Sequence, residues 1–253
     1  MLFETFNVER VHIANSSMLG LYSYGKTSGL ILDSGFGLTS AVPIYEGYPL
    51  PHASQKVNFG GENISELLLS MLQYHGISKA FKGVKGRLLA DNIKEKFGYI
   101  AKNIEEEEKR FLSSEPREYT LPDNFKIKLG NEIYKHTEFL FKPQNLNITP
   151  IHQLVKDSLD KCDQDIISEI MENICLIGGN TLLNGFPERL HYELAAITNN
   201  NVSNIIYSAE RQFSSWIGGS IVSSLSNFLP MWVTKQEYDE IGNALEAIDS
   251  KCF

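Results

Sequence analysis

The sequence has little of what several common protein classes require, beginning with positive charge. It carries 23 Lys and Arg against 31 Asp and Glu over 253 residues, a formal net charge of −8. No basic surplus is present to pair with phosphates, which argues against general affinity for nucleic acid or anionic lipid. Its three cysteines, Cys162, Cys175 and Cys252, lie far apart without CxxC spacing. This spacing disfavours a metal site and a disulfide framework.

Long apolar runs are missing as well. No apolar stretch is long enough to span a bilayer. The N-terminal residues 1–10 contain Glu4 and lack both the basic start and the apolar core of a signal peptide. We therefore expect a soluble protein of a reducing compartment, the cytoplasm or the nucleus, with no membrane partner. The apolar content of 42% supplies a real core for one large or two small domains.

The clearest local pattern is a hairpin with a carboxylate at its bend. Gly29 to Asp33 predicts a buried strand, residues 34–37 a tight turn, and Leu38 to Ile44 the returning strand. A second hairpin is predicted around the turn Gly130-Asn131, because Phe125, Ile127 and Leu129 alternate before it and Ile133 follows.

Apolar residues recur at helical spacing in several stretches. The expected helices are one capped by Asn63, one from about Leu88 to Phe111, one opened by Thr149-Pro150, one capped by Asp163, one around Arg189 to Ala196, and one from Ile221 to Phe228 that Pro230 helps to end. Short strands are expected at Ile174–Ile177, before Gly178-Gly179, and at Ile205–Tyr207. Strands and helices therefore alternate, which indicates an α/β fold.

Local chemistry leaves alternatives open. Asp33 followed by Ser34-Gly35-Phe36-Gly37 suits a metal-bound phosphate, since glycines let backbone N–H groups approach anionic oxygens. The alternative is a purely structural turn, because Asp, Ser and Gly favour hairpin turns in many proteins. Gly178-Gly179 before a helix suits a phosphate or sugar contact, or close packing of helix on strand. His52 is expected to be a structural loop residue. No Walker or Rossmann pattern and no catalytic triad is present, so the residues alone indicate a phosphate binder at most.

Ten segments of the sequence resemble segments of actin in the same order. They are Met1-Leu-Phe-Glu-Thr-Phe-Asn7, Asp33-Ser-Gly35, Val42-Pro-Ile-Tyr-Glu-Gly47, Leu50-Pro-His-Ala53, Asn92-Ile-Lys-Glu-Lys96, Leu121-Pro-Asp123, Trp216-Ile-Gly-Gly-Ser-Ile221, Met231-Trp232, Lys235-Gln-Glu-Tyr-Asp239 and Lys251-Cys-Phe253. The resemblance covers the whole chain. Many long matches in order are specific to actin and close relatives rather than to sugar kinases or heat-shock ATPases.

The resemblance implies an actin-like ATPase domain, a ribonuclease H-like α/β fold, present here as its C-terminal half with an inserted α-rich subdomain. The divisions that it implies are residues 1–56 as α/β core with the phosphate hairpin, 57–150 as the inserted lobe, 151–213 as the return to the core, and 214–253 as C-terminal helices of a partner lobe. Actins begin well before the segment that Met1 matches. The first phosphate hairpin and the small outer subdomain are therefore expected to be absent.

In the family, ATP or ADP with Mg sits in a cleft between two related halves. Carried over by position, the resemblance implies that Asp33 faces the water shell of the metal. The nucleotide contacts that it implies are Ser34, Gly35, Gly37 and Leu38 at the phosphates, Lys94 and Glu95 at the adenosine, and Gly178, Gly179 and Thr181 on the other side of the nucleotide.

The sequence departs from the family where hydrolysis occurs. The glutamine that positions the attacking water is replaced by Ser16, the assisting histidine by Ser40, and the second acidic residue of the hairpin by Phe36. Near the adenine, Leu183 replaces a tyrosine and Gln212 a lysine. We therefore expect no catalytic residues, impaired or absent hydrolysis, and ATP binding that is weakened or lost, because an apolar group beside the phosphates desolvates them without a partner.

A groove that accepts amphipathic helices in the family is better preserved. The matching positions are Tyr22, Gly25, Thr27, Gly47, Val222, Leu225 and Met231. They imply actin or actin-binding proteins as partners, or self-association, although retained packing residues are the alternative. The tail with Trp216, Phe228 and Trp232 is expected to expose an apolar face.

Three functions stay open at this point. The favoured one is a cytoskeletal or structural actin-like protein of the cytoplasm, a filament or complex subunit with little or no hydrolysis. The second is an ATP-binding actin with slow ATPase activity. The third is a non-functional truncated paralogue, or a fragment whose natural product is longer.

Overall fold

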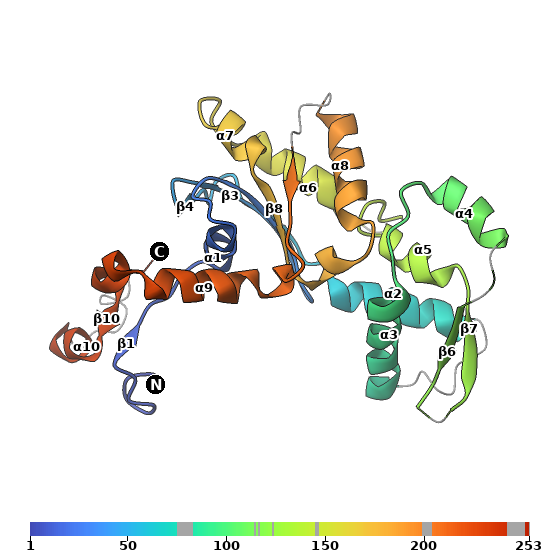
Figure 1. The fold of residues 1–253 in the computed structure, drawn as a ribbon, viewed down its shortest axis with the longest axis horizontal. Coiled ribbons are helices and arrows are strands. Elements are labelled where there is room, and N and C mark those ends of the chain that lie inside the picture. Colours follow the sequence, from blue (N-terminus) through green and yellow to red (C-terminus); the bar gives the residue numbers. More distant parts are fainter. Residues whose placement is uncertain are drawn as a thin grey trace.

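The computed structural model describes residues 1–74, 83–113, 115, 117–122, 124–144, 147–198, 204–241 and 251–252. Figure 1 shows the arrangement of their elements. The strands are β1 (Arg10–Val11), β2 (Gly29–Ser34), β3 (Thr39–Tyr45), β4 (Tyr48–Pro49), β5 (Gln55–Val57), β6 (Arg117–Thr120), β7 (Lys126–Leu129), β8 (Ile174–Ile177), β9 (Ile205–Ile206) and β10 (Val233–Thr234). The α-helices are α1 (Ser16–Ser23), α2 (Gly61–Tyr74), α3 (Gly83–Phe97), α4 (Ile104–Leu112), α5 (Glu132–Glu138), α6 (Ile151–Leu159), α7 (Ile167–Glu172), α8 (Phe186–Ile197), α9 (Ser214–Ser224) and α10 (Lys235–Ile241). The 3₁₀ helices are η1 (Gly179–Leu182), η2 (Arg211–Phe213) and η3 (Ser226–Met231).

A mixed sheet forms the centre of the molecule. β2 pairs antiparallel with β3, from Gly29 opposite Ile44 to Ser34 opposite Thr39, and parallel with β8. β9 extends the sheet parallel to β8, and β4 and β5 both pair with the outer side of β3. The sheet is six-stranded in the order β4-β3-β2-β8-β9 with β5 beside β3. The seven-residue β3 has room for two short neighbours, β4 and β5, along one edge.

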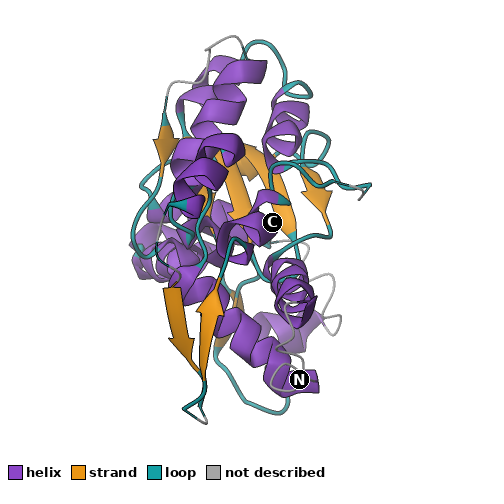
Figure 2. Ribbon diagram, turned by 90° about the vertical axis from the view of Figure 1, so that its right-hand side faces the viewer, coloured by secondary structure: helices purple, strands orange, loops and turns teal. Residues whose placement is uncertain are grey.

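Both faces of the sheet are covered by helices. Along β2, Leu30 and Leu32 belong to the core cluster that includes α6 and α8, whereas Ile31 belongs to the cluster under α1. Successive strand residues point to opposite faces, so this continuous apolar run is buried on both. Figure 2 shows the strands in the middle with helices on either side. The α/β class expected from the sequence is confirmed.

An α-rich part made of α2 to α5 with the hairpin β6–β7 lies at one side of the sheet (Figure 1). It has a separate apolar core in which Leu68, Leu72 and Ile93 pack against Leu129 and Ile133. It falls within residues 57–150, where the inserted lobe was expected, and the proposed division of the chain stays a prediction.

At the other side, α9 lies along α1. A Cβ atom on Gly218 would lie 1.7 Å from the carbonyl oxygen of Leu19, so only glycine permits this close helix contact. The Ser215 hydroxyl donates to the Ser16 carbonyl (2.9 Å) at the start of the two helices. Beyond α9, β10 pairs with β1 and so joins the two ends of the chain.

The expected helix from Leu88 to Phe111 is wrong, because two helices occupy this stretch. α3 ends at Phe97, and the Ile100 N–H then donates to the Asn184 carbonyl (2.8 Å), so the backbone leaves the helix to pair with the core. Asn103 starts α4 as its N-cap and accepts from the N–H groups of Glu105 and Glu106.

Other helix starts also differ from expectation. Asn63 does not cap α2, which begins at Gly61; its side chain accepts from the Gly60 N–H from within the first turn. α6 begins at Ile151, so Pro150 takes the N-cap position and Thr149 lies outside the helix. Asp163 precedes a turn, and α7 begins only at Ile167.

Two further expectations are corrected. The second hairpin turns before Phe125 rather than at Gly130-Asn131, and α5 follows this dipeptide, with Glu132 accepting from the Gly130 N–H (2.7 Å). The helix expected from Ile221 to Phe228 is α9, which ends at Ser224, and Pro230 lies within η3. None of the helices in the described residues is both long and apolar enough to cross a membrane.

Candidate functional site

The turn between β2 and β3 presents backbone donors to solvent. The Gly35 N–H donates to the Leu38 carbonyl (3.0 Å). Within the described residues, the N–H groups of Phe36, Gly37 and Leu38 have no acceptor. A Cβ on Gly37 would meet no atom within 4 Å, so this turn is open to a ligand. Neighbouring free N–H groups at a turn form a concavity that suits an anion.

Asp33 lies just before this turn. Its carboxylate is partly buried, and burial raises its pKa above the ordinary value. Gly178, at the end of β8, lies directly against it: a Cβ there would be 2.5 Å from the Asp33 Oδ1 and 2.4 Å from the Ser34 carbonyl oxygen. Gly178 also has φ of 90°, which favours glycine. The first loop, which is the turn between β2 and β3, and the second loop, which begins at Gly178 after β8, therefore touch at Asp33.

The second loop is held to the first by Asn180. Its side-chain amide donates to the Ser34 hydroxyl (3.1 Å) and to the Gly35 carbonyl (2.7 Å). Thr181, by contrast, is fully buried, and its hydroxyl donates to the Gly178 carbonyl (2.7 Å) and accepts from the Arg211 Nε (3.0 Å). Asn180 thus fixes the distance between the loops, and Thr181 supports the second loop from behind.

Lys94 comes from α3 in the α-rich part. It is 7% exposed, and its Nζ donates to the Gly61 carbonyl (3.0 Å), the Ser65 hydroxyl (2.8 Å) and the Asp91 carboxylate (3.2 Å). Three acceptors satisfy the three donors of an ammonium group. The charge of Lys94 is therefore used to join α3 to the start of α2.

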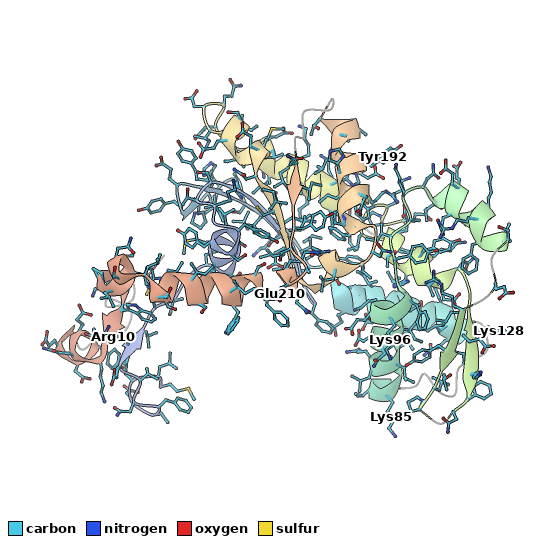
Figure 3. All side chains as sticks on the ribbon, in the orientation of Figure 1. Arg10, Lys85, Lys96, Lys128, Tyr192 and Glu210 are labelled. Carbon is cyan, nitrogen blue, oxygen red and sulfur yellow. The ribbon has the colours of Figure 1, made fainter. Side chains whose placement is uncertain are left out.

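These elements surround a cavity of about 640 Å³. Gly35, Lys94, Glu95 and Gly179 line it, as do the replaced positions Phe36, Leu183 and Gln212. Asp33, Ser34, Gly37, Leu38, Gly178 and Thr181 do not line it, although the free turn adjoins it through Phe36. Figure 3 shows Lys96, another lining residue, at the end of α3 nearest the sheet and Lys85 at the opposite end.

Sequence reasoning missed several residues of this cavity. They are Gly61, Lys96, Gly98, Asn180, Leu182 and Asn184. The pair Gly60-Gly61 ahead of a helical pattern was the available signal, because the Gly61 N–H donates to the Gly35 carbonyl (3.0 Å) and brings the start of α2 to the hairpin. In the described ranges, no three His, Cys, Asp or Glu side chains converge as metal ligands.

A second cavity, of about 480 Å³, lies between α1, the β3–β4 turn and the end of α9. We call it the α1–α9 groove. All seven residues expected at a partner groove line it: Tyr22, Gly25, Thr27, Gly47, Val222, Leu225 and Met231. Ile221 and Phe228 add apolar surface that the sequence reasoning did not include. The structure thus brings together residues from three distant parts of the sequence.

Comparison with known proteins decides the family. The model of the family described as Actin matches residues 1–253. The chain belongs to the actin family. Curated relatives agree: the chain is 40% identical over 244 residues to Actin-like protein 7A of Rattus norvegicus, 39% over 244 residues to that of Homo sapiens, and 38% over 246 residues to that of Mus musculus.

These matches cover 96% of this actin-family chain but 55% of each of the three relatives. The chain therefore spans about half the length of the curated relatives it matches. The family confirms the expected fold, an actin-like ATPase fold of the α/β class.

The positions associated with hydrolysis can now be placed in this actin-family chain. Ser16 is exposed at the first turn of α1, and Ser40 faces Asp33 across the hairpin. Phe36 is 58% exposed at the turn, where it lines the cavity. Lys94, Glu95 and Lys96 are the charged residues among those described that line the cavity. No histidine or aspartate is among the described residues that line the cavity.

Proposed function

We propose that this actin-family chain is a structural or interaction protein of the cytoskeleton, a subunit of a filament or complex that binds an amphipathic helix and hydrolyses ATP poorly or not at all. The observation that carries the proposal is the α1–α9 groove, where every expected lining residue comes together. The positions that serve hydrolysis in the family hold Ser16, Ser40 and Phe36 instead. Partner binding is thus preserved where catalysis is not.

The chemistry of the groove suits a helix with one apolar face. Its apolar floor is made by Met18, Val222 and Phe228, and the exposed Leu225 and Met231 stand at its side. Lys26 and Glu46 supply charge of both signs at the edge, as in the polar rim of an interface. A helix would insert side chains spaced three, four or seven residues apart. Actin itself, actin-binding proteins or a second copy could supply such a helix.

The residues at the first cavity fit a nucleotide in part. The three free N–H groups of the β2–β3 turn suit the negatively charged oxygens of a polyphosphate. The carboxylate of Asp33 suits a hydrated Mg ion, which when bound would balance part of the phosphate charge. In this chain the N–H groups of Phe36, Gly37 and Leu38 would hold the phosphates, and Glu95 would face the sugar side. Phe36 adds an apolar side chain next to these donors, which weakens binding because it displaces water from charged oxygens.

The second candidate is an ATP-binding protein with slow hydrolysis. The free hairpin turn and the cavity of about 640 Å³ favour it. A non-functional paralogue is the third, and it predicts that both sites fail to bind.

The groove is tested with a fluorescent 18-residue amphipathic helix that carries leucines on one face. We expect saturable one-site binding. The variant Leu225→Asp places a charge in the groove at a 47%-exposed position and should weaken binding at least about tenfold. The control Leu112→Asp, at an 88%-exposed leucine at the end of α4, should bind normally. Equal binding of the helix by both variants would show that it does not bind in the α1–α9 groove.

The nucleotide site is tested by calorimetry with Mg-ATP and by phosphate release. We expect weak or no heat of binding and no release above buffer. Saturable binding with steady phosphate release would favour the ATPase instead, and would leave the groove result unchanged because the two cavities share no lining residue.

A further inference from the structure

A histidine lies in the wall of the α1–α9 groove, beside its apolar floor. His12 follows β1, and the pairing of β1 with β10 brings it next to Met231 and Trp232, which precede β10. Its side chain lines the groove together with Met18 and Val222. A partner that fills this part of the groove therefore meets one imidazole among apolar side chains.

The imidazole ring of His12 is held by its neighbours. Its Nδ1 lies 3.0 Å from the carbonyl oxygen of Met231. The ring meets that of Phe228 at 83°, with the centroids 4.8 Å apart, and the Trp232 centroid lies at 6.4 Å. The Cys252 Sγ is 3.7 Å from the same Nδ1, a longer contact than that with Met231. These contacts fix which edge of the ring the protein uses.

The contact with Met231 also decides which ring nitrogen carries the proton. A carbonyl oxygen only accepts hydrogen bonds, so the Nδ1 of His12 must be the donor. A neutral imidazole has one N–H group, and Nε2 is therefore an acceptor with a free lone pair. Within the described part of the chain this Nε2 has no hydrogen-bond partner, and it is not among the unpartnered atoms sealed from solvent. The groove thus presents one open acceptor.

A bound helix would remove solvent from this acceptor. An entirely apolar helix face would leave the Nε2 lone pair covered and unpaired, which opposes binding. A donor on the helix removes that penalty. Serine and threonine hydroxyls can bond to a carbonyl of their own helix instead, and lysine would bring an unpaired charge over the apolar floor. The side-chain amide of asparagine or glutamine is neutral and offers two N–H groups, so it suits this position best.

We propose that His12 makes the α1–α9 groove selective for amphipathic helices that carry one asparagine or glutamine within the apolar face, whose amide donates to the Nε2 of His12. This inference rests on the proposed function of the groove and specifies its partner class. His12 is then the residue that determines specificity, while the apolar floor supplies the contact area.

The test scans the labelled amphipathic helix by replacing each leucine of its apolar face in turn with glutamine or with methionine. Methionine has a similar length but no donor. At one position the glutamine helix should bind the chain at least about fivefold more tightly than the methionine helix. Glutamate at that position should bind at least about tenfold more weakly than glutamine, because a carboxylate only accepts. The titrations are made at about pH 8, where histidine side chains are in general neutral.

The matched variant His12→Phe keeps a flat ring beside Phe228 but removes both nitrogens. It should bind the methionine helix as tightly as the wild-type chain does, which shows that the groove is intact, and it should no longer prefer glutamine. The control His191→Phe, at an exposed histidine on α8, should keep the preference.

A second measurement needs no variant. In NMR spectra of the wild-type chain with nitrogen-labelled histidines, the histidine whose Nε2 signal shifts when the glutamine helix is added should carry its proton on Nδ1. A proton on Nε2 of that histidine would overturn the inference.

The helix titrations separate this inference from the proposed function. A glutamine preference that is present in the wild-type chain and in His191→Phe, and is lost in His12→Phe, supports it. Equal binding of glutamine and methionine helices at every position overturns the inference and leaves the groove as a binding site. A preference that persists in His12→Phe also overturns it. If no helix binds the wild-type chain, the proposed function of the groove fails, and the inference fails with it.

Discussion

The attachment of the α-rich part to the sheet depends on Arg189, a residue of α8 that is 1% exposed. Its Nη1 and Nη2 donate to the two carboxylate oxygens of Glu138 (2.9 and 2.7 Å), which ends α5. Nη1 also donates to the Ala101 carbonyl (2.6 Å), and Nε to Glu193 (2.7 Å). Burial alone would lower the pKa of Arg189, but the hydrogen bonds and charges of the two carboxylates raise it overall. One side chain thus ties the two parts that enclose the first cavity.

Replacing Arg189 by methionine keeps an unbranched apolar stem but removes the guanidinium group, which leaves the Glu138 carboxylate buried without its partner. Removing one member of a buried ion pair costs about 3–5 kcal/mol. We expect the free energy of unfolding in urea, followed by circular dichroism, to fall by that amount. The double variant Arg189→Met with Glu138→Gln should recover part of the loss, because the unpaired charge is gone.

The control is Arg87→Met. Arg87 bonds Glu62 and Glu66 at the surface (3.0 and 3.1 Å), where such pairs contribute about 1 kcal/mol or less. A loss of less than about 1 kcal/mol in Arg189→Met, equal to that of Arg87→Met, would refute the reasoning that this pair holds the parts together. Hydrogen exchange should rise in α2 and α3 if the attachment loosens.

Three further predictions concern buried groups. Burial lowers the pKa of His136 from 6.5 to about 4, so its contribution to stability is present above pH 6.5 and is lost as pH falls toward 4. The urea midpoint of unfolding should therefore fall less between pH 7 and pH 4.5 in His136→Leu than in the wild-type chain. Gly218→Ala should lower the free energy of unfolding in urea by at least about 2 kcal/mol, because the added methyl group would overlap the Leu19 carbonyl. The control Gly37→Ala, at an open position, should lower it by less than about 1 kcal/mol. Lys94→Met should lower stability by about 2 kcal/mol whether or not Mg-ATP is present, and a loss of nucleotide binding without a loss of stability would contradict its structural role.

Much of the fold follows from local sequence. The run Gly29 to Asp33 is apolar at each position before the carboxylate, and the strand buried on both faces forms there. The strand before Gly178 and the helix after it were likewise predictable, because the glycines mark the turn between them. The boundary between α3 and α4 was not, since it depends on pairing of Ile100 with Asn184, 84 positions later.

The candidate site was predictable only at positions that could be matched to positions of the actin family. The groove residues came from resemblance, and no periodicity connects Tyr22, Gly47 and Val222 before folding. Lys94 shows the limit most clearly: its type suggests a ligand contact, but its ammonium group faces Gly61 and Ser65 within the protein. The direction of a side chain depends on packing of α2 against α3, which spacing does not reveal.

The central claim, that partner binding persists without catalysis, is tested most directly by titrating the labelled amphipathic helix into the nucleotide-free 253-residue chain and again in the presence of excess Mg-ATP. The account predicts saturable one-site binding with affinities that differ by less than about twofold between the two titrations, and a loss of affinity of at least about tenfold in Leu225→Asp under both conditions. Binding that requires Mg-ATP, or no saturable binding in either titration, would contradict it.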